Sequence, residues 1–183
     1  AVAEGLLDGG VLPVVKHIPG HGRAEADSHH DLPVVKAVKS DLQEVDFEPF
    51  RTLNDLPLGM TAHVVYSAID GLPATLSAPM MRVIRDEIGF DGLIMTDDIS
   101  MKALQGTLPD LTRKALAAGC DVMLHCNGTL AERQAVAEAA GAMSDAAQRR
   151  AERALTWRKT PDPVDISALS AQLDALMSGR VHG

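Results

Sequence analysis

Short apolar runs that alternate with helical patterns constrain the fold of this chain more than any other feature. The apolar runs cover 11–15, 58–62, 92–96 and 121–124, and helical patterns cover 40–47, 77–87, 111–118, 130–155 and 167–177. Strands that alternate with helices predict a parallel sheet, and strands that are apolar along most of their length predict a sheet covered on both faces. The sequence therefore predicts an α/β fold.

Ionisable side chains stand at the end of each apolar run. They are Lys16 and His17, His63, Asp97 and Asp98, and His125. The absence of a GxGxxG or GxxxxGK phosphate motif after any run weighs against a doubly wound sheet. In (β/α)8 TIM barrels the catalytic groups lie at the C-terminal ends of several strands. We therefore expect a TIM-barrel type of fold, of which this chain supplies the C-terminal half, with one shared site.

Composition narrows the class of ligand. The chain of 183 residues has 17 Lys and Arg against 25 Asp and Glu, a formal net charge of −8, which argues against nucleic-acid binding. Because no apolar stretch approaches the roughly 18 residues of a membrane span, we expect no membrane partner. Cys120 and Cys126 fit neither a disulfide framework nor a CxxC motif, so we expect reduced thiols in a cytoplasmic protein.

The segment 16–33, KHIPGHGRAEADSHHDLP, holds four of the seven histidines. It starts at a strand end and continues as a loop of about twenty residues, a length that is usually functional or disordered in a compact domain. Within it, Asp27 precedes His29 by two residues. A carboxylate beside an imidazole fixes the tautomer of the ring and tunes its pKa. We therefore regard Asp27 and His29 as a candidate catalytic pair.

Two adjacent acids, Asp97 and Asp98, close the third apolar run. Burial of an unpaired carboxylate is costly, so packing alone does not explain them. We expect one to face the site and the other to cap the following helix. Strand alternation sends the two side chains to opposite sides, and their spacing leaves open which of them faces the site.

Four ordered segments resemble the bacterial β-N-acetylglucosaminidases of glycoside hydrolase family 3. They are KHIPGHG, DSH, MTAHVVYSAIDGLPATLS at 60–77 and GFDGLIMTDDISMKAL at 89–104, and the resemblance runs from about residue 11 to residue 124. It implies that Asp97 is the nucleophile, His29 the general acid/base and Asp27 the carboxylate that partners His29. A retaining glycosidase needs such a nucleophile and a group that first protonates the leaving oxygen and then deprotonates water.

The resemblance also implies the substrate and its ligands. Lys16 and His17 match the pair that binds the sugar, and we add His63, at the neighbouring strand end, as a third substrate-binding candidate. The implied reaction removes terminal N-acetylglucosamine from muropeptides in cytoplasmic cell-wall recycling, with no metal and no cofactor. An imidazole suits this proton transfer because its ordinary pKa is about 6.5.

Members of this family are longer than this chain. The first ten residues, AVAEGLLDGG, have the pattern of a helix that ends at Gly9 and Gly10, and we expect the N-terminal half of the barrel to be missing. We expect residues 1–160 to form the C-terminal half of the catalytic barrel and residues 161–183 to form a helix and a tail. The isolated chain should then need the missing half or self-association.

Two other functions stay open. One is a metal-dependent hydrolase on the same fold that uses His17, His63, His125 and Asp97 as zinc ligands, although Lys16 beside His17 would repel a cation. The other is an inactive, sugar-binding fragment. The sequence also leaves open the aglycone preference, the oligomeric state and the choice between hydrolysis and phosphorolysis.

Overall fold

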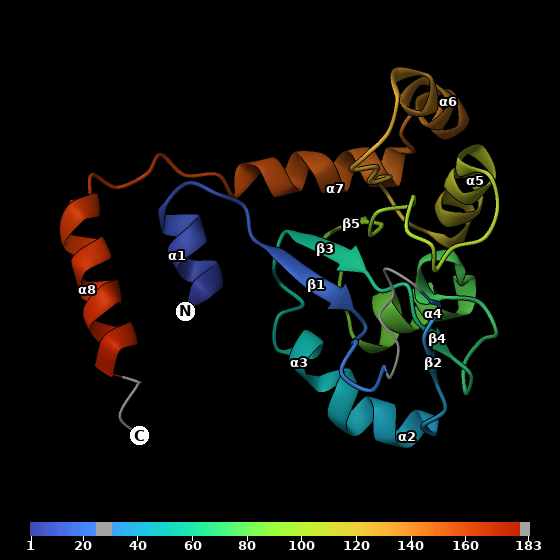
Figure 1. Cartoon of the computed structure of the whole chain (residues 1–183), viewed down its shortest axis with the longest axis horizontal. Coiled ribbons are helices and arrows are strands. Elements are labelled where there is room, and N and C mark those ends of the chain that lie inside the picture. Colours follow the sequence, from blue (N-terminus) through green and yellow to red (C-terminus); the bar gives the residue numbers. More distant parts are fainter. Residues whose placement is uncertain (25–30, 180–183) are drawn as a thin grey trace.

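A parallel sheet lies at the centre of the computed structural model, which describes residues 1–24 and 31–179 (Figure 1). The sheet has the order β1-β3-β5, from β1 (Val14–Ile18), β3 (Leu58–Thr61) and β5 (Leu93–Met95). A parallel bridge between Met95 and Val122 continues it beyond β5. Within this sheet, strands that follow one another along the chain are therefore neighbours in space, and the predicted α/β class with parallel pairing is confirmed.

Two further strands form a small parallel sheet of their own. In it β2 (Val34–Val35) pairs with β4 (Val65–Tyr66), with Val34 opposite Val65. Each strand is only two residues long, too short to give an alternating or continuous apolar pattern, and the sequence did not predict them. The pairing holds the segment before α2 against the segment that follows β3.

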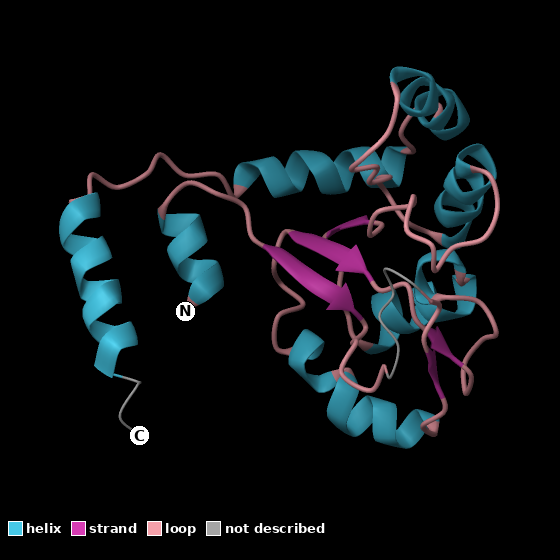
Figure 2. Ribbon diagram, viewed as in Figure 1, coloured by secondary structure: helices cyan, strands magenta, loops and turns pink. Residues whose placement is uncertain are grey.

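The chain forms helices of varied length, most of which pack around the sheet (Figure 2). They are α1 (Val2–Asp8), α2 (Lys39–Asp41), α3 (Glu48–Arg51), α4 (Ala78–Arg82), α5 (Leu108–Ala118), α6 (Leu130–Ala140), α7 (Asp145–Thr156) and α8 (Ile166–Ser178). Single turns of other helix types are η1 (Leu42–Asp46), η2 (Ala74–Leu76) and η3 (Val83–Glu87). Five helices begin at side chains that accept a backbone N–H three residues on: Ser77, Thr107, Thr129, Ser144 and Asp165. These caps satisfy donors that the first turn leaves unpaired.

The single helix predicted over 130–155 is wrong. The structure has two helices there, α6 and α7, separated by residues 141–144. Gly141 has a φ of +63°, a conformation that few residues other than glycine adopt, and the hydroxyl of Ser144 then caps α7. The alanine-rich sequence on both sides concealed this break.

The predicted strand at 121–124 is reduced to one bridge. The carboxylate of Asp121 accepts the backbone N–H of Ile94 at 2.9 Å, and the hydroxyl of Thr96 accepts the backbone N–H of Leu124 at 3.0 Å. Side chains thus take hydrogen bonds that carbonyl groups accept in a regular ladder. The first strand is also shifted: β1 begins at Val14, after Pro13, so Lys16 and His17 lie within it.

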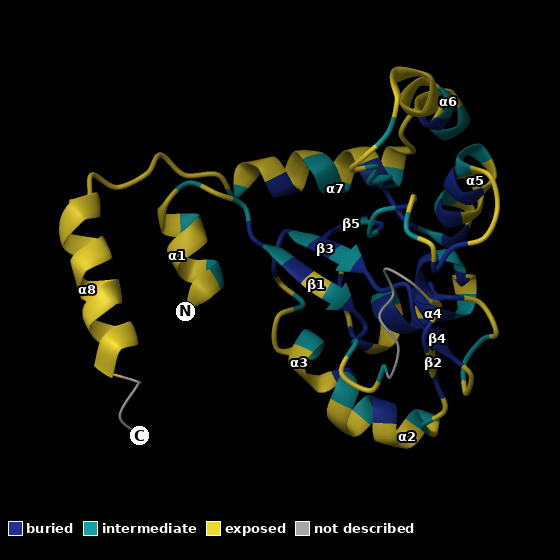
Figure 3. Ribbon diagram, viewed as in Figure 1, coloured by how far each residue is buried: buried dark blue, intermediate teal, exposed yellow. Residues whose placement is uncertain are grey.

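The core packs against the sheet and extends under β4. Fully buried residues include Phe47, Phe90, Ile94 and Ile18. A Cβ atom on Gly59 would lie 2.7 Å from Ile18 Cδ1 and 2.8 Å from the Phe90 ring, so the absence of a side chain on β3 lets that ring approach the strand. By contrast, α8 lies apart from the sheet and is exposed along its whole length, and α1 is mostly exposed (Figure 3). Among the described residues, no helix has the length and apolar character needed to span a bilayer.

Candidate active site

Polar side chains from successive strand ends converge at one edge of the sheet. His17 Nε2 on β1 lies 3.5 Å from Asp97 Oδ2, just beyond β5. His63, beyond β3, contacts the backbone of Asp98, and His125 lies 3.6 Å from the Asp98 carboxylate. Parallel strands bring their C-terminal ends to the same edge, and the predicted shared position of these side chains is confirmed, although the segment before His125 forms a single bridge and not a strand.

Asp97 is the acid that faces the open edge. Its Oδ1 atom accepts the backbone N–H of Asp98 at 2.8 Å, whereas its Oδ2 atom faces His17. The side chain retains 19% of its exposed surface. One carboxylate oxygen is therefore held by the backbone, and the other is available to a ligand.

Asp98, unlike Asp97, is surrounded by hydrogen-bond donors of the protein. The sequence left open which of the two acids faces the site, and the structure shows that it is Asp97. Its carboxylate accepts the backbone N–H of Ser100 at 3.0 Å, the Ser100 hydroxyl at 2.8 Å and the backbone N–H of Cys126 at 3.3 Å. Burial opposes its ionisation, but these hydrogen bonds outweigh burial and hold the pKa of Asp98 below its usual range. Asp98 caps a turn, rather than the helix that we expected.

His17 lies next to Asp97 as a mainly neutral ring. Burial lowers the pKa of His17 and outweighs the attraction of Asp97, and the Lys16 ammonium lowers it further. Its ring meets that of His21 edge to face, with 6.2 Å between the centroids. A neutral ring leaves the negative charge of Asp97 largely uncompensated, as suits a carboxylate nucleophile.

Lys16 occupies the other side of β1. Its side chain is exposed and lines a pocket of about 440 Å³ beside α1 and α3, whereas His17 turns toward Asp97. The Lys16 charge reaches the site through its effect on the pKa of His17. Its predicted contact with a sugar stays a prediction.

His63 is fully buried beneath the site. Its Nε2 atom lies 3.0 Å from the carbonyl oxygen of Asp98, and its Nδ1 atom lies 2.7 Å from the hydroxyl of Thr75. Because a carbonyl only accepts, Nε2 carries the proton, and burial lowers the pKa of the ring and keeps it neutral. Both ring nitrogens of His63 are thus hydrogen-bonded within the protein, and the predicted contact of His63 with substrate stays untested.

Two threonines complete the support of His63, and the sequence analysis did not select them. Thr61 Oγ1 lies 2.9 Å from Thr75 Oγ1, and both residues are fully buried. Each belongs to the segment 60–77 that carries the resemblance, and a buried threonine near a strand end was the available signal. The Thr75 hydroxyl lies within hydrogen-bond distance of the Ala62 carbonyl oxygen, at 3.1 Å, as well as of the His63 ring, so its single proton goes to one of the two.

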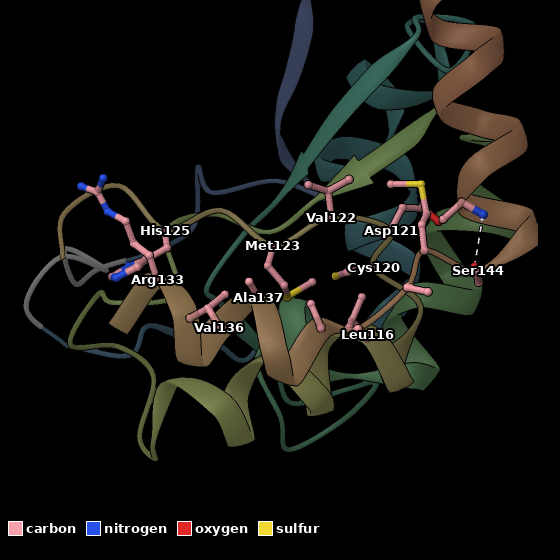
Figure 4. Close-up of a pocket in the computed structure, with 15 residues that line it drawn as sticks. Leu116, Cys120, Asp121, Val122, Met123, His125, Arg133, Val136, Ala137 and Ser144 are labelled. Carbon is pink, nitrogen blue, oxygen red and sulfur yellow. Dashed lines mark hydrogen bonds between the residues drawn. The ribbon is translucent and has the colours of Figure 1, made fainter. Parts of the chain in front are cut away.

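His125 borders a pocket of about 570 Å³ between the segment 120–125 and the helices α5, α6 and α7 (Figure 4). Most of the lining is apolar and includes Leu116, Met123 and Val136. The side chain of His125 is 6% exposed, and neither ring nitrogen has a hydrogen-bond partner within the described residues. In the same part of the chain, no group of three His, Cys, Asp or Glu side chains is arranged to hold a metal ion, so the zinc set considered above is not assembled.

Asp27 and His29, the predicted acid/base pair, lie outside the described residues. The residues that flank them are anchored by hydrogen bonds to distant parts of the chain. The hydroxyl of Tyr66 donates to the carbonyl of Gly20, and Arg23 Nε lies 2.6 Å from Asp46 Oδ2. On the other side, the carbonyl of Pro33 accepts the backbone N–H of Val65 at 2.9 Å.

Comparison with known proteins finds relatives along most of the chain. Residues 1–156 match the family described as the glycosyl hydrolase family 3 N terminal domain. The β-hexosaminidase of Alkalilimnicola ehrlichii is 46% identical over 128 residues, covering 67% of this chain and 37% of that protein. The β-hexosaminidase of Thioalkalivibrio sulfidiphilus is 37% identical over 185 residues, covering 98% of this chain and 45% of that protein. The chain spans less than half the length of these relatives.

Solved structures give the same result. A glycoside hydrolase family 3 β-N-acetylglucosaminidase from Paenibacillus sp. str. FPU-7 superposes with a TM-score of 0.76 at 30% identity, covering 90% of this chain and 34% of that one. The β-N-acetylglucosaminidase from Thermotoga maritima superposes with a TM-score of 0.69 at 35% identity, covering 86% of this chain and 38% of that one. With most of its length matched in sequence and in structure, the chain belongs to glycosyl hydrolase family 3.

Proposed function

We propose that this chain carries the nucleophile of a retaining exo-β-N-acetylglucosaminidase. The observation that carries the proposal is the unequal use of the two acids: Asp98 is held by the protein, whereas Asp97 presents one oxygen at the edge where the strands end. Relatives named β-hexosaminidase support the reaction class. We propose terminal N-acetylglucosamine of muropeptides as the substrate group, in the cytoplasm.

The chemistry has two displacement steps. In the first, Asp97 Oδ2 bonds to the anomeric carbon while the bond from that carbon to the leaving oxygen breaks, and His29 gives the leaving oxygen a proton. In the second, His29 takes a proton from water, the water oxygen bonds to the anomeric carbon and the bond to Asp97 breaks. This sequence retains the configuration of the sugar.

The residues around Asp97 fit the role of a nucleophile. The hydrogen bond from Asp98 N fixes the rotation of the Asp97 carboxylate, and the neutral ring of His17 leaves its charge available. We assign His63 to positioning, since its proton goes to the carbonyl of Asp98. Lys16 and His17 remain the proposed ligands of the sugar.

The strand order supports a half-barrel as the finer description of the fold. In a TIM barrel each strand pairs with the next along the chain, whereas a doubly wound sheet reverses its order at a switch point. The order β1-β3-β5 followed by Val122 shows no reversal. We propose that residues 1–160 form the C-terminal half of the barrel and that residues 161–183 form a helix and tail.

Trapping of the covalent intermediate tests the function. The protein, as the cell produces it, is incubated with a 5-fluoro-N-acetylglucosaminyl fluoride, which forms the glycosyl-enzyme faster than it is hydrolysed. Mass spectrometry of the digested protein should then find one added sugar on Asp97. An adduct on another carboxylate, or inversion of configuration in the product, would contradict the proposal.

Substitution of the nucleophile gives the kinetic counterpart. Asp97→Asn should lower turnover of every β-N-acetylglucosaminide by roughly four orders of magnitude or more, because the covalent intermediate cannot form. The matched control is Asp55→Asn, which changes an exposed aspartate away from the strand ends. Equal rates in Asp97→Asn and the control would rule out this role.

A further inference from the structure

We propose that His125 is a positioning residue for the nucleophile, and that it acts by donating a hydrogen bond from Nδ1 to Asp98 Oδ1 when substrate is bound. The inference rests on the proposed function, because the group that His125 positions is Asp97, the proposed nucleophile. It concerns a side chain that the reaction itself does not use.

The first argument is the unsatisfied ring. The side chain of His125 is 94% buried, and both of its nitrogens lack a hydrogen-bond partner in the described part of the chain. Buried polar atoms in folded proteins are nearly always paired, so an exception calls for a partner. Asp98 Oδ1 lies 3.6 Å from Nδ1, slightly beyond hydrogen-bond distance. Hydrogen bonds in active sites often become short only in the substrate complex.

The second argument is the confinement of the ring. A Cβ atom on Gly128 would lie 2.1 Å from Nε2 and 2.8 Å from Cε1, so the ring occupies the space that a side chain would take there. Glu132 Oε2, a nearby acceptor, is engaged by the backbone N–H and the hydroxyl of Thr129. On the pocket side lie Val136 and Arg133, which accept no hydrogen bond (Figure 4). Asp98 Oδ1, at 3.6 Å from Nδ1, is the acceptor that a small movement of the ring brings within hydrogen-bond distance.

The third argument is the short path from Asp98 to the nucleophile. The backbone N–H of Asp98 holds Asp97 Oδ1, and the carbonyl of Asp98 accepts the proton of His63. Ser100 Oγ lies 2.8 Å from both carboxylate oxygens of Asp98 and has one proton, which it can give to Oδ2. Oδ1 then accepts the backbone N–H groups of Ser100 and Cys126, and His125 is its third donor. A bond from His125 would then restrict rotation of the residue whose peptide group orients Asp97.

Two substitutions separate positioning from simple packing. His125→Asn places an amide N–H near the position of Nδ1, and His125→Leu fills similar space without a donor. With 4-nitrophenyl N-acetyl-β-glucosaminide, we expect His125→Leu to lower kcat about tenfold with KM within twofold, because only orientation in the transition state is lost. His125→Asn should keep kcat within threefold of the unmodified protein. Met143→Leu, in the same pocket, is the control.

Thermal unfolding of each variant is measured alongside. If His125 only fills space, the two variants should lose kcat equally, and the loss should parallel a fall in Tm. Equal kcat losses in His125→Asn and His125→Leu, or an unchanged kcat in His125→Leu, would overturn the proposal.

A second readout does not require turnover. In a ¹⁵N–¹H spectrum of the histidine-labelled protein with N-acetylglucosamine bound, we expect a slowly exchanging proton on Nδ1 of His125, assigned by its loss in His125→Asn. A proton on Nε2 only, or rapid exchange, would contradict the inference. This readout remains valid if Asp97→Asn keeps full activity, so failure of the proposed function and failure of this inference are distinguishable.

Discussion

At the scale of single residues, adjacent side chains of the same type have different tasks. Asp97 and Asp98 follow the same strand, yet Asp98 is surrounded by donors from Ser100 and Cys126, whereas Asp97 receives one backbone N–H. Hydrogen bonds to the charged form stabilise a carboxylate and reduce its nucleophilicity. The number of donors around each acid therefore separates the supporting residue from the reactive one.

Substitution of His29 should affect substrates according to their leaving groups. A nitrophenolate leaves without a proton, whereas a sugar alkoxide needs one, so His29→Ala should slow hydrolysis of an oligosaccharide by about 10²- to 10⁴-fold and that of a 4-nitrophenyl glycoside much less. Azide should restore turnover of the activated substrate by attacking the intermediate, and Asp27→Ala should show the same pattern more weakly. Steady-state kinetics with and without azide check this. Equal losses for both substrates without rescue would assign His29 to binding.

The buried histidines should make stability depend on pH. Burial lowers the pKa of both His63 and His17, and this effect outweighs the opposing influence of Asp98 and Asp97 on His63 and of Asp97 on His17. A group whose folded pKa lies below its unfolded value of about 6.5 binds fewer protons in the native state, so stability is full above that value and falls as the pH decreases below it. We expect Tm to fall between pH 7.5 and pH 5.5, and to fall less steeply in His63→Gln. Parallel curves for the two proteins would count against a buried neutral His63.

At the scale of elements, a charged network joins α7 to the end of the sheet. The buried carboxylate of Asp121 accepts from Arg85 at 2.8 Å, from Arg150 at 3.0 Å and from the backbone N–H of Ile94. Arg150 and Arg153 on α7 also reach Asp91. The network explains why the segment at 121–124 follows β5 closely with only one ladder bridge.

Removal of the central carboxylate should therefore destabilise the fold. Asp121→Ala leaves two guanidinium groups and one backbone N–H near β5 without their shared acceptor, and breaking a buried ion pair from one side costs about 3–5 kcal/mol. Urea unfolding should show this loss, whereas Asp145→Ala, at the first position of α7, should change stability by about 1 kcal/mol or less. A loss for Asp121→Ala as small as that of the control would show that the network contributes little.

At the scale of the whole molecule, apolar surface and an open strand edge remain. In the described residues β1 pairs with β3 on one side only, and exposed apolar side chains project from α1 and α8. They are Val2, Leu6, Ile166, Leu169, Leu173 and Leu176. Edge strands and apolar faces of this kind promote association.

We therefore expect the isolated 183-residue chain to associate and to have little activity without further barrel strands. Light scattering coupled to size-exclusion chromatography measures the association, and hydrolysis of 4-nitrophenyl N-acetyl-β-glucosaminide measures the activity. A stable monomer with full turnover would contradict this expectation.

Patterns that are local along the chain determined the class of the fold and the edge that carries the site. Apolar runs separated by helical patterns predict parallel strands, and parallel strands place the residues that follow them, such as His17 and Asp97, at one edge. This prediction needs no knowledge of contacts, because burial of each run is favourable whichever helix covers it. The recognisable segments added the expected chemistry in the same local way.

Only the tertiary structure decided how each polar group is used. Asp97 and Asp98 have the same side chain, and their difference comes from donors at Ser100 and Cys126, the latter 28 residues farther along the chain. The hydrogen bonding of His63 likewise depends on Thr75, and the loss of a regular fourth strand depends on the carboxylate of Asp121. Hydrogen bonding and desolvation depend on neighbours that are distant in sequence, and the fold alone brings those neighbours together.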